Sequence, residues 1–97
     1  VEGTTVELNT NGHHTTYEMK ISGFDLNTST NKVYGVVLAT ADGSEYGLHH
    51  VTNIWSGTEL GFNADDPYFA SIIGKTVTQI IYYTADGVYV LPVSVAL

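Results

Sequence analysis

The chain has 97 residues, with three lysines, no arginine, no cysteine and ten acidic residues, and its formal net charge is −7. This length fits one domain with a single hydrophobic core. The absence of cysteine excludes disulfides, thiolate nucleophiles and zinc–cysteine sites. The acidic balance has the wrong sign for binding phosphate backbones or anionic lipid, so we expect no nucleic-acid partner. No apolar stretch approaches the roughly 20 residues that a membrane span needs.

A β-hairpin is predicted in the first part of the chain. Residues 4–10 alternate between apolar and polar side chains, as a half-buried strand does. An Asn-Gly pair at 11–12 is a strong hairpin-turn signal, and alternation resumes over 15–22. We therefore expect these two strands to pair. The polar stretch 25–31 is predicted to be a loop.

Two further hairpins are predicted from an internal repeat. The segments 33–43 and 77–87 each contain β-branched and aromatic residues that end in Thr-Ala-Asp-Gly, and an apolar run follows each one. Glycine supplies the positive φ that tight hairpin loops need. The repeat is explained either by a duplicated hairpin unit or by one good turn used twice. Residues 33–40 are apolar on both faces, which predicts a central strand covered on both sides.

The last third of the chain contains a helix signal and an edge-strand signal. Asp66 is a good N-cap, Pro67 suits the first helical position and Gly74 is a terminator, so we predict a two-turn helix near 67–73. Pro92 cannot donate a hydrogen bond to a neighbouring strand. The final strand is therefore predicted to be an edge strand, or bulged at that point.

Together these elements predict a mainly β fold with one short helix. We expect a single domain over residues 1–97, built as an antiparallel sandwich or a partly open barrel of about six strands in three hairpins. This domain could also be one module of a longer or repetitive protein. The residues predicted to be buried are Val6, Leu8, Tyr17, Met19, Ile21, Val36, Leu38, Ile80, Leu91 and Val93.

The histidines are candidates for a zinc or copper site. They form two adjacent pairs, His13-His14 and His49-His50, and imidazole is the commonest protein ligand for these metals. Adjacent residues of a strand point to opposite faces, so each pair needs donors from elsewhere. The alternative is that they are ordinary turn and strand residues. If a site exists, it requires a member of each pair.

A second candidate metal site consists of oxygen donors around the predicted helix start. Calcium prefers six to eight oxygen ligands, and Glu59, Asn63, Asp65 and Asp66 supply several of them in a segment predicted to be irregular. Helix capping and the helix dipole explain the two aspartates without an ion. No EF-hand spacing is present. No cofactor is required by any motif in the chain.

Catalytic signatures are missing from the sequence. It contains no nucleophile elbow, no histidine-rich metalloprotease motif and no glycine-rich phosphate loop, so we expect no enzymatic activity. Trp55 lies in a loop-like segment and gives two further possibilities. It could contribute to a protein contact, or it could form a sugar-binding platform together with loop tyrosines, which would require coplanar and exposed rings.

The preferred interpretation is a non-catalytic β module that acts through protein contact or self-assembly. Residues 88–97 form a long apolar strand with no charged side chain, and such an edge lacks the lysines that commonly protect sheets from pairing. A protein partner or a second copy is therefore expected, with no small-molecule ligand indicated. The predicted contact residues are Val88, Tyr89, Val90, Leu91, Val93, Val95 and Trp55.

An extracytoplasmic location is predicted from composition. The chain has few charged residues and many threonines, asparagines and glycines, as secreted and cell-surface β modules do. It begins at Val1, which fits a processed secreted protein or a domain of a longer one.

Overall fold

The computed structural model describes residues 5–10, 16–23, 33–48 and 59–97. These residues form strands β1 (Thr5–Thr10), β2 (Thr16–Ser22), β3 (Val33–Thr40), β4 (Glu45–Leu48), β5 (Glu59–Asn63), β6 (Thr76–Thr84) and β7 (Gly87–Ala96), and one helical turn, α1 (Pro67–Ala70). The predicted turn at 11–12, the predicted loop at 25–31, both histidine pairs and Trp55 lie outside the described residues.

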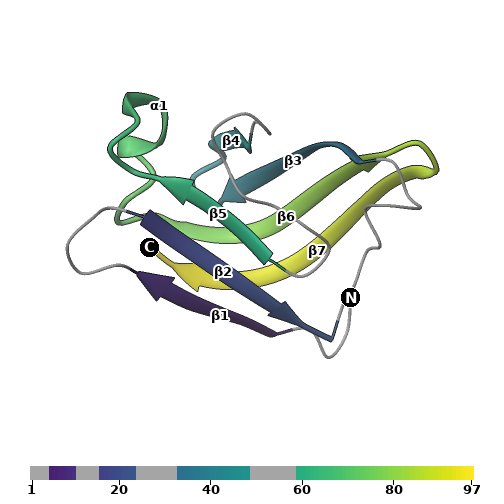
Figure 1. Ribbon diagram of the computed structural model, residues 1–97, viewed down its shortest axis with the longest axis horizontal. Coiled ribbons are helices and arrows are strands. Elements are labelled where there is room, and N and C mark those ends of the chain that lie inside the picture. Colours follow the sequence, from purple (N-terminus) through teal and green to yellow (C-terminus); the bar gives the residue numbers. More distant parts are fainter. Residues whose placement is uncertain (1–4, 11–15, 24–32, 49–58) are drawn as a thin grey trace.

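The strands form two antiparallel sheets that pack face to face (Figure 1). One sheet has the order β1-β2-β5 and the other has the order β4-β3-β6-β7. The mainly β prediction is confirmed. The sequence predicted either a sandwich or a partly open barrel. The described strands fit the sandwich, because they lie in separate sheets and do not close into a barrel. The described part of the chain has no helix long and apolar enough to cross a membrane.

The first sheet contains the predicted N-terminal hairpin and one strand that was not predicted. β1 pairs with β2 so that Leu8 lies opposite Met19, and β5 pairs with the other side of β2 so that Leu60 lies opposite Met19. The segment that forms β5 was expected to be irregular, and this expectation is wrong. Leu60 and Phe62 alternate around Gly61, and a glycine in a short strand weakens the sequence signal.

In the second sheet, β3 is central as predicted, but its two faces differ. Val36, Leu38 and Thr40 are buried against the first sheet, whereas Val37 and Ala39 on the other face are only half-buried. The expectation of full cover on both sides is therefore wrong. β7 is an edge strand, and a register shift near Pro92 marks a bulge, so both parts of the Pro92 prediction are confirmed.

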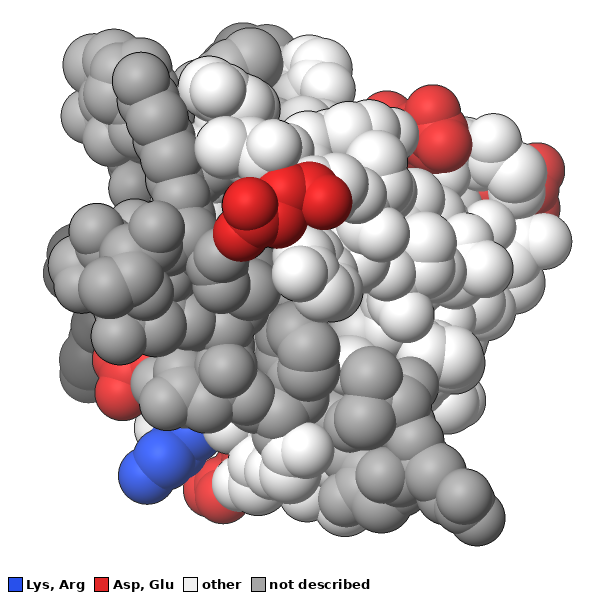
Figure 2. Space-filling model, turned by 90° about the vertical axis from the view of Figure 1, so that its right-hand side faces the viewer, with Lys and Arg blue, Asp and Glu red and all other residues white. Residues whose placement is uncertain are grey.

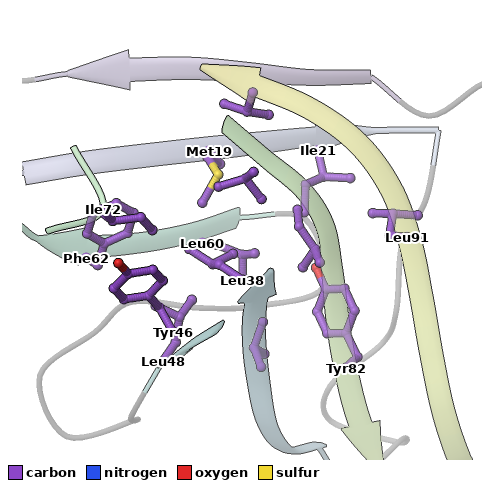
Figure 3. Close-up of a cluster of buried hydrophobic side chains, with 14 of the residues drawn as sticks. Met19, Ile21, Leu38, Tyr46, Leu48, Leu60, Phe62, Ile72, Tyr82 and Leu91 are labelled. Atoms are coloured by element: carbon purple, nitrogen blue, oxygen red, sulfur yellow. The ribbon is translucent and has the colours of Figure 1, made fainter. Parts of the chain in front are cut away.

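The core lies between the two sheets and is closed at one end by the segment around α1. Figure 3 shows side chains from both sheets meeting in this layer. Phe62 of β5 stacks on Phe69 of α1 with 5.1 Å between the ring centroids. Of the residues predicted to be buried, those fully buried are Met19, Ile21, Val36, Leu38, Ile80 and Leu91, and those only partly buried against the core are Val6, Leu8, Tyr17 and Val93.

The helix is shorter than predicted. It covers the single turn Pro67–Ala70, where the sequence predicted two turns. Asp66 caps it as expected, since its side chain accepts a hydrogen bond from the N–H of Tyr68 at 3.0 Å. The turns that follow α1 end at Gly74, which has φ +90° and donates its N–H to the carbonyl oxygen of Leu97 at 2.9 Å. This long-range bond fixes the segment against the end of β7.

Both predicted Thr-Ala-Asp-Gly turns close hairpins, but they do so in different ways. In the β3–β4 turn, Asp42 accepts hydrogen bonds from the hydroxyl of Thr40 and from the N–H of Ser44. In the β6–β7 turn, the threonine hydroxyl takes the central place. The hydroxyl of Thr84 donates to the carbonyl oxygen of Gly87 at 2.9 Å and accepts from the N–H of Asp86 at 3.1 Å.

Candidate interaction surface

β7 has one paired edge and one open edge within the described structure. It pairs with β6 along its length, and no other described strand forms a ladder with it. β1 lies near β7 where the two sheets meet, without pairing to it. The tip of the β6–β7 hairpin extends beyond the strands of the first sheet (Figure 1). This tip and the open edge beside it form the candidate site.

The backbone groups on the open edge belong to alternate residues of β7. In an antiparallel ladder, alternate residues direct both N–H and C=O toward the same neighbour. Pro92 has no N–H, and proline is tolerated in a strand where the backbone N–H would point away from the neighbouring strand, here β6. Val90 and Val88 lie two and four residues before Pro92, so their backbone N–H and C=O groups also point away from β6. The hairpin turn agrees, because a two-residue β-turn is closed by bonding between its flanking residues, here Thr84 and Gly87.

The open edge is therefore richest in hydrogen-bonding groups near the hairpin tip. Val88 and Val90 each offer a donor and an acceptor, while Pro92 offers only an acceptor. Proline on an edge strand limits pairing with other chains. Pairing by a further strand is thus favoured over 87–91 and disfavoured beyond it.

The side chains at the same place are apolar and exposed. Five of the exposed large hydrophobic residues lie at this end of the sheet, Tyr89 on the opposite face from Tyr83, Val88 and Val90, and we call them the tip surface: Tyr34 (65% exposed), Tyr83 (41%), Val88 (57%), Tyr89 (38%) and Val90 (44%). Tyr83 lies opposite Val88 in the β6–β7 ladder. Seen from this end, the molecule shows a broad area without charged groups (Figure 2).

The predicted contact residues divide into two groups. Val88, Tyr89 and Val90 are exposed, as a contact requires. Leu91 and Val95 are buried in the core. Val93 is half-buried and packs against the core. The first half of β7 is thus available to a partner, and the second half stabilises the fold. Sequence reasoning missed Tyr34 and Tyr83, because their exposure depends on the bulge in β3 and on the uncovered face of the sheet.

The opposite edge of the same sheet is partly blocked. Tyr68, in α1, places its hydroxyl 2.8 Å from the N–H of Gly47 in β4 and accepts a hydrogen bond from it. A side chain thereby satisfies a donor that faces away from β3. An incoming strand would have to displace this tyrosine at β4, whereas the described structure has no comparable block at β7.

A polar cluster around Lys75 is the most chemically distinctive group elsewhere in the described structure. The ammonium of Lys75 lies 3.0 Å from Asp42 Oδ2, donates to the hydroxyl of Ser44 at 3.1 Å and lies 5.5 Å from the ring centroid of Tyr46. The hydroxyl of Tyr46 is 2.9 Å from that of Ser71. These contacts join the β3–β4 turn to the segment that leads into β6.

The cluster shifts the pKa values of its members. Hydrogen bonds from Thr40, Lys75 and Ser44 hold the pKa of Asp42 well below its ordinary value. Bonding with Ser71 and Lys75 lowers the pKa of Tyr46. These shifts come from groups that already satisfy one another, so we interpret the cluster as structural. A separate effect acts in the core, where burial raises the pKa of Tyr82.

The predicted calcium donors occupy different places. Glu59 and Asn63 begin and end the strand β5, and four residue steps along a strand separate their backbones by about 13 Å. The side chain of Asn63 accepts a hydrogen bond from the N–H of Asp65 at 2.8 Å, and Asp66 caps α1. The described residues contain no group of three or more metal-ligating side chains. Local hydrogen bonds to backbone N–H groups thus account for the side chains of Asn63 and Asp66 without an ion.

The outer face of the first sheet has a shallow groove of about 170 Å³. Its charged lining alternates in sign across the strands, because Lys20 of β2 lies between Glu7 of β1 and Glu59 of β5. Glu18 lines the groove as well. This pattern fits cross-strand charge pairing on a solvent-facing sheet.

Comparisons of the chain with protein-family models, with curated protein sequences and with solved structures found no significant match. The tip surface and the open edge of β7 are therefore the features from which a function can be inferred.

Proposed function

We propose that this domain is a non-catalytic, extracytoplasmic β module that acts through protein–protein contact, by accepting a strand from another chain at the open edge of β7. The observation behind this proposal is the coincidence of open backbone groups and exposed apolar side chains at Val88 and Val90. Strand addition obtains affinity from main-chain hydrogen bonds and specificity from alternate side chains. The low charge content of the sequence supports the extracytoplasmic part.

Energetics favour strand addition over a flat side-chain contact at this place. Each new backbone hydrogen bond contributes about 1 kcal/mol net. Covering the exposed valines and tyrosines adds roughly 25 cal/mol for each Å² of apolar surface removed from water. A short added strand also costs ordering entropy. We therefore expect modest affinity from the edge alone.

A strand peptide of neutral sequence tests the proposal directly. The probe is an acetylated, amidated peptide of alternating threonine and valine, titrated into the isotopically labelled domain and followed by amide NMR shifts. We expect shifts concentrated at Val88 and Val90, because their N–H groups form the new bonds. Absence of localised shifts up to millimolar peptide would contradict strand acceptance at this edge.

A matched pair of variants provides the control. Val90→Lys places a charge on the acceptor edge and should weaken peptide binding at least severalfold. Ile73→Lys makes the same kind of change at a residue that is 42% exposed and belongs to the turn after α1. Peptide binding to Ile73→Lys should equal that of the unchanged domain.

A further inference from the structure

We infer that the strand accepted at this edge is β7 of a second copy of the chain, paired antiparallel about a two-fold axis through Tyr89. This inference rests on the proposed function, since it uses the same edge and names its occupant. The result is a dimer whose continuous sheet runs β4-β3-β6-β7 in one copy and then β7-β6-β3-β4 in the other.

The charge distribution favours a second copy as the partner. β7 has no charged residue, so nothing on the edge attracts a basic or an acidic strand. The net charge of −7 arises from residues outside β7, and Asp86 in the hairpin loop is the acidic residue next to β7 in sequence. Two copies of β7 can therefore meet without opposing like charges in the ladder. The site therefore suits an apolar, uncharged strand that has an open edge of its own. β7 of a second copy is such a strand.

The position of Pro92 selects the register. With Tyr89 opposite Tyr89, each Val88 lies opposite Val90 of the other copy, and every outward N–H and C=O of these valines finds a partner. Moving the axis to Val90 puts Val88 opposite Pro92, which leaves a carbonyl of Val88 without a donor. Moving it to Val88 brings Asp86 into the ladder opposite Val90.

The side chains agree with this register. On the outer face, Val88 and Val90 of the two copies form one apolar stripe, flanked in each copy by Tyr83. On the other face the two Tyr89 rings meet at the axis. Aromatic and β-branched neighbours across strands contribute roughly 0.2–1 kcal/mol each. The contact is smaller than a standard stable interface, so we expect a dimer that dissociates on dilution.

Single-cysteine variants test the register, because the chain contains no cysteine of its own. In a non-hydrogen-bonded antiparallel pair the Cα atoms are about 4.5 Å apart, within the range of a disulfide. Tyr89→Cys should therefore form a disulfide-linked dimer under mild oxidation at least tenfold faster than Ile73→Cys, a control at a residue of similar exposure. Equal rates for the two variants would overturn the inference, and so would faster cross-linking of Val90→Cys.

Sedimentation of the unchanged domain gives an independent measure. We expect a monomer–dimer equilibrium that Val90→Lys shifts at least tenfold toward monomer and that Ile73→Lys leaves unchanged. Growth beyond the dimer would overturn the inference, because the two-fold arrangement uses up the open edge. If the domain stays monomeric at millimolar concentration while the threonine–valine peptide still binds, self-pairing is wrong and the proposed function stands. If neither association occurs, both fail.

Discussion

Val37 and Ile81 lie directly opposite each other at the middle of the β3–β6 ladder, and they occupy equivalent positions in the two repeated segments of the sequence. The two neighbouring pairs are exchanged by the same symmetry, since Leu38 pairs with Ile80 and their repeat equivalents, Tyr82 and Val36, pair with each other. A local two-fold axis between these strands therefore relates β3 to β6, whereas the turns of the two attached hairpins differ by one residue in length. Pairing of equivalent residues favours a duplicated hairpin unit over a single turn used twice.

The first prediction concerns the core beside this axis. Leu38 and Ile80 are fully buried and face each other. Replacing either by alanine should lower the free energy of unfolding by about 2–5 kcal/mol, through lost burial and an unfilled cavity. Urea denaturation measures the change. Val37→Ala, at a half-buried position on the outer face, should cost clearly less, and a loss under roughly 1 kcal/mol for Ile80→Ala would contradict a central place for β6.

Local patterning in the sequence was sufficient to predict the hairpins and part of the core. Alternation located β1 and β2, and the repeated turn located the second sheet. The features that the sequence did not predict depend on contacts between residues far apart in the chain. After Ala70 the helical bonds give way to three-residue turns, in which the N–H of Ile72 bonds to the carbonyl oxygen of Phe69, and the Gly74–Leu97 bond then fixes this segment to the end of β7. β5 depends on pairing with β2 more than on its own propensity.

The tip surface was predicted only in part for a similar reason. The lack of charge in β7 is a property of the sequence, but the division between exposed Val90 and buried Leu91 depends on which face the first sheet covers. Tyr34 became part of the surface through a bulge in β3, and bulges leave little trace in residue composition.

The second prediction concerns the glycine of the β3–β4 turn. Gly43 has φ +89°, a conformation that costs a residue with a Cβ roughly 1–2 kcal/mol. Gly43→Ala should therefore destabilise the domain by about 1 kcal/mol, measured by thermal or urea unfolding. Gly35→Ala is the control, because the φ of Gly35 is not positive and an added Cβ would meet nothing within 4 Å. Equal destabilisation by both changes would argue against a backbone effect at Gly43.

The third prediction concerns the tyrosine that blocks the β4 edge. Tyr68→Phe removes the hydroxyl that accepts the N–H of Gly47 and should cost about 0.5–1.5 kcal/mol, the usual net value of one hydrogen bond. Amide exchange at Gly47 should also become faster. Tyr83→Phe makes the same change on an exposed ring and should alter stability by less than about 0.5 kcal/mol. Unchanged exchange at Gly47 in Tyr68→Phe would show that the bond does not protect this edge.

The last prediction is a pH dependence that originates at Asp42. Its folded-state pKa is depressed below the ordinary value of 3.8 by hydrogen bonds from Thr40, Lys75 and Ser44. A depressed carboxylate pKa stabilises the folded state above the unfolded-state pKa, and this contribution disappears as the pH falls toward the folded-state value. Asp42→Asn should therefore be less stable than the unchanged domain near neutral pH, and the difference should shrink as the pH drops below about 4.

Two controls separate this effect from the general acid response of an acidic protein. Asp86→Asn changes the equivalent aspartate of the other Thr-Ala-Asp-Gly turn, where the threonine hydroxyl and not the carboxylate accepts the turn N–H. At neutral pH, Asp86→Asn should cost less stability than Asp42→Asn, because the Asp42 carboxylate accepts hydrogen bonds from Thr40 and Ser44 and pairs with Lys75. High salt should reduce the Asp42 effect only in part, because screening weakens the ion pair with Lys75 but leaves the hydrogen bonds within the turn. A pH profile of Asp42→Asn parallel to that of the unchanged domain would contradict a depressed pKa at Asp42.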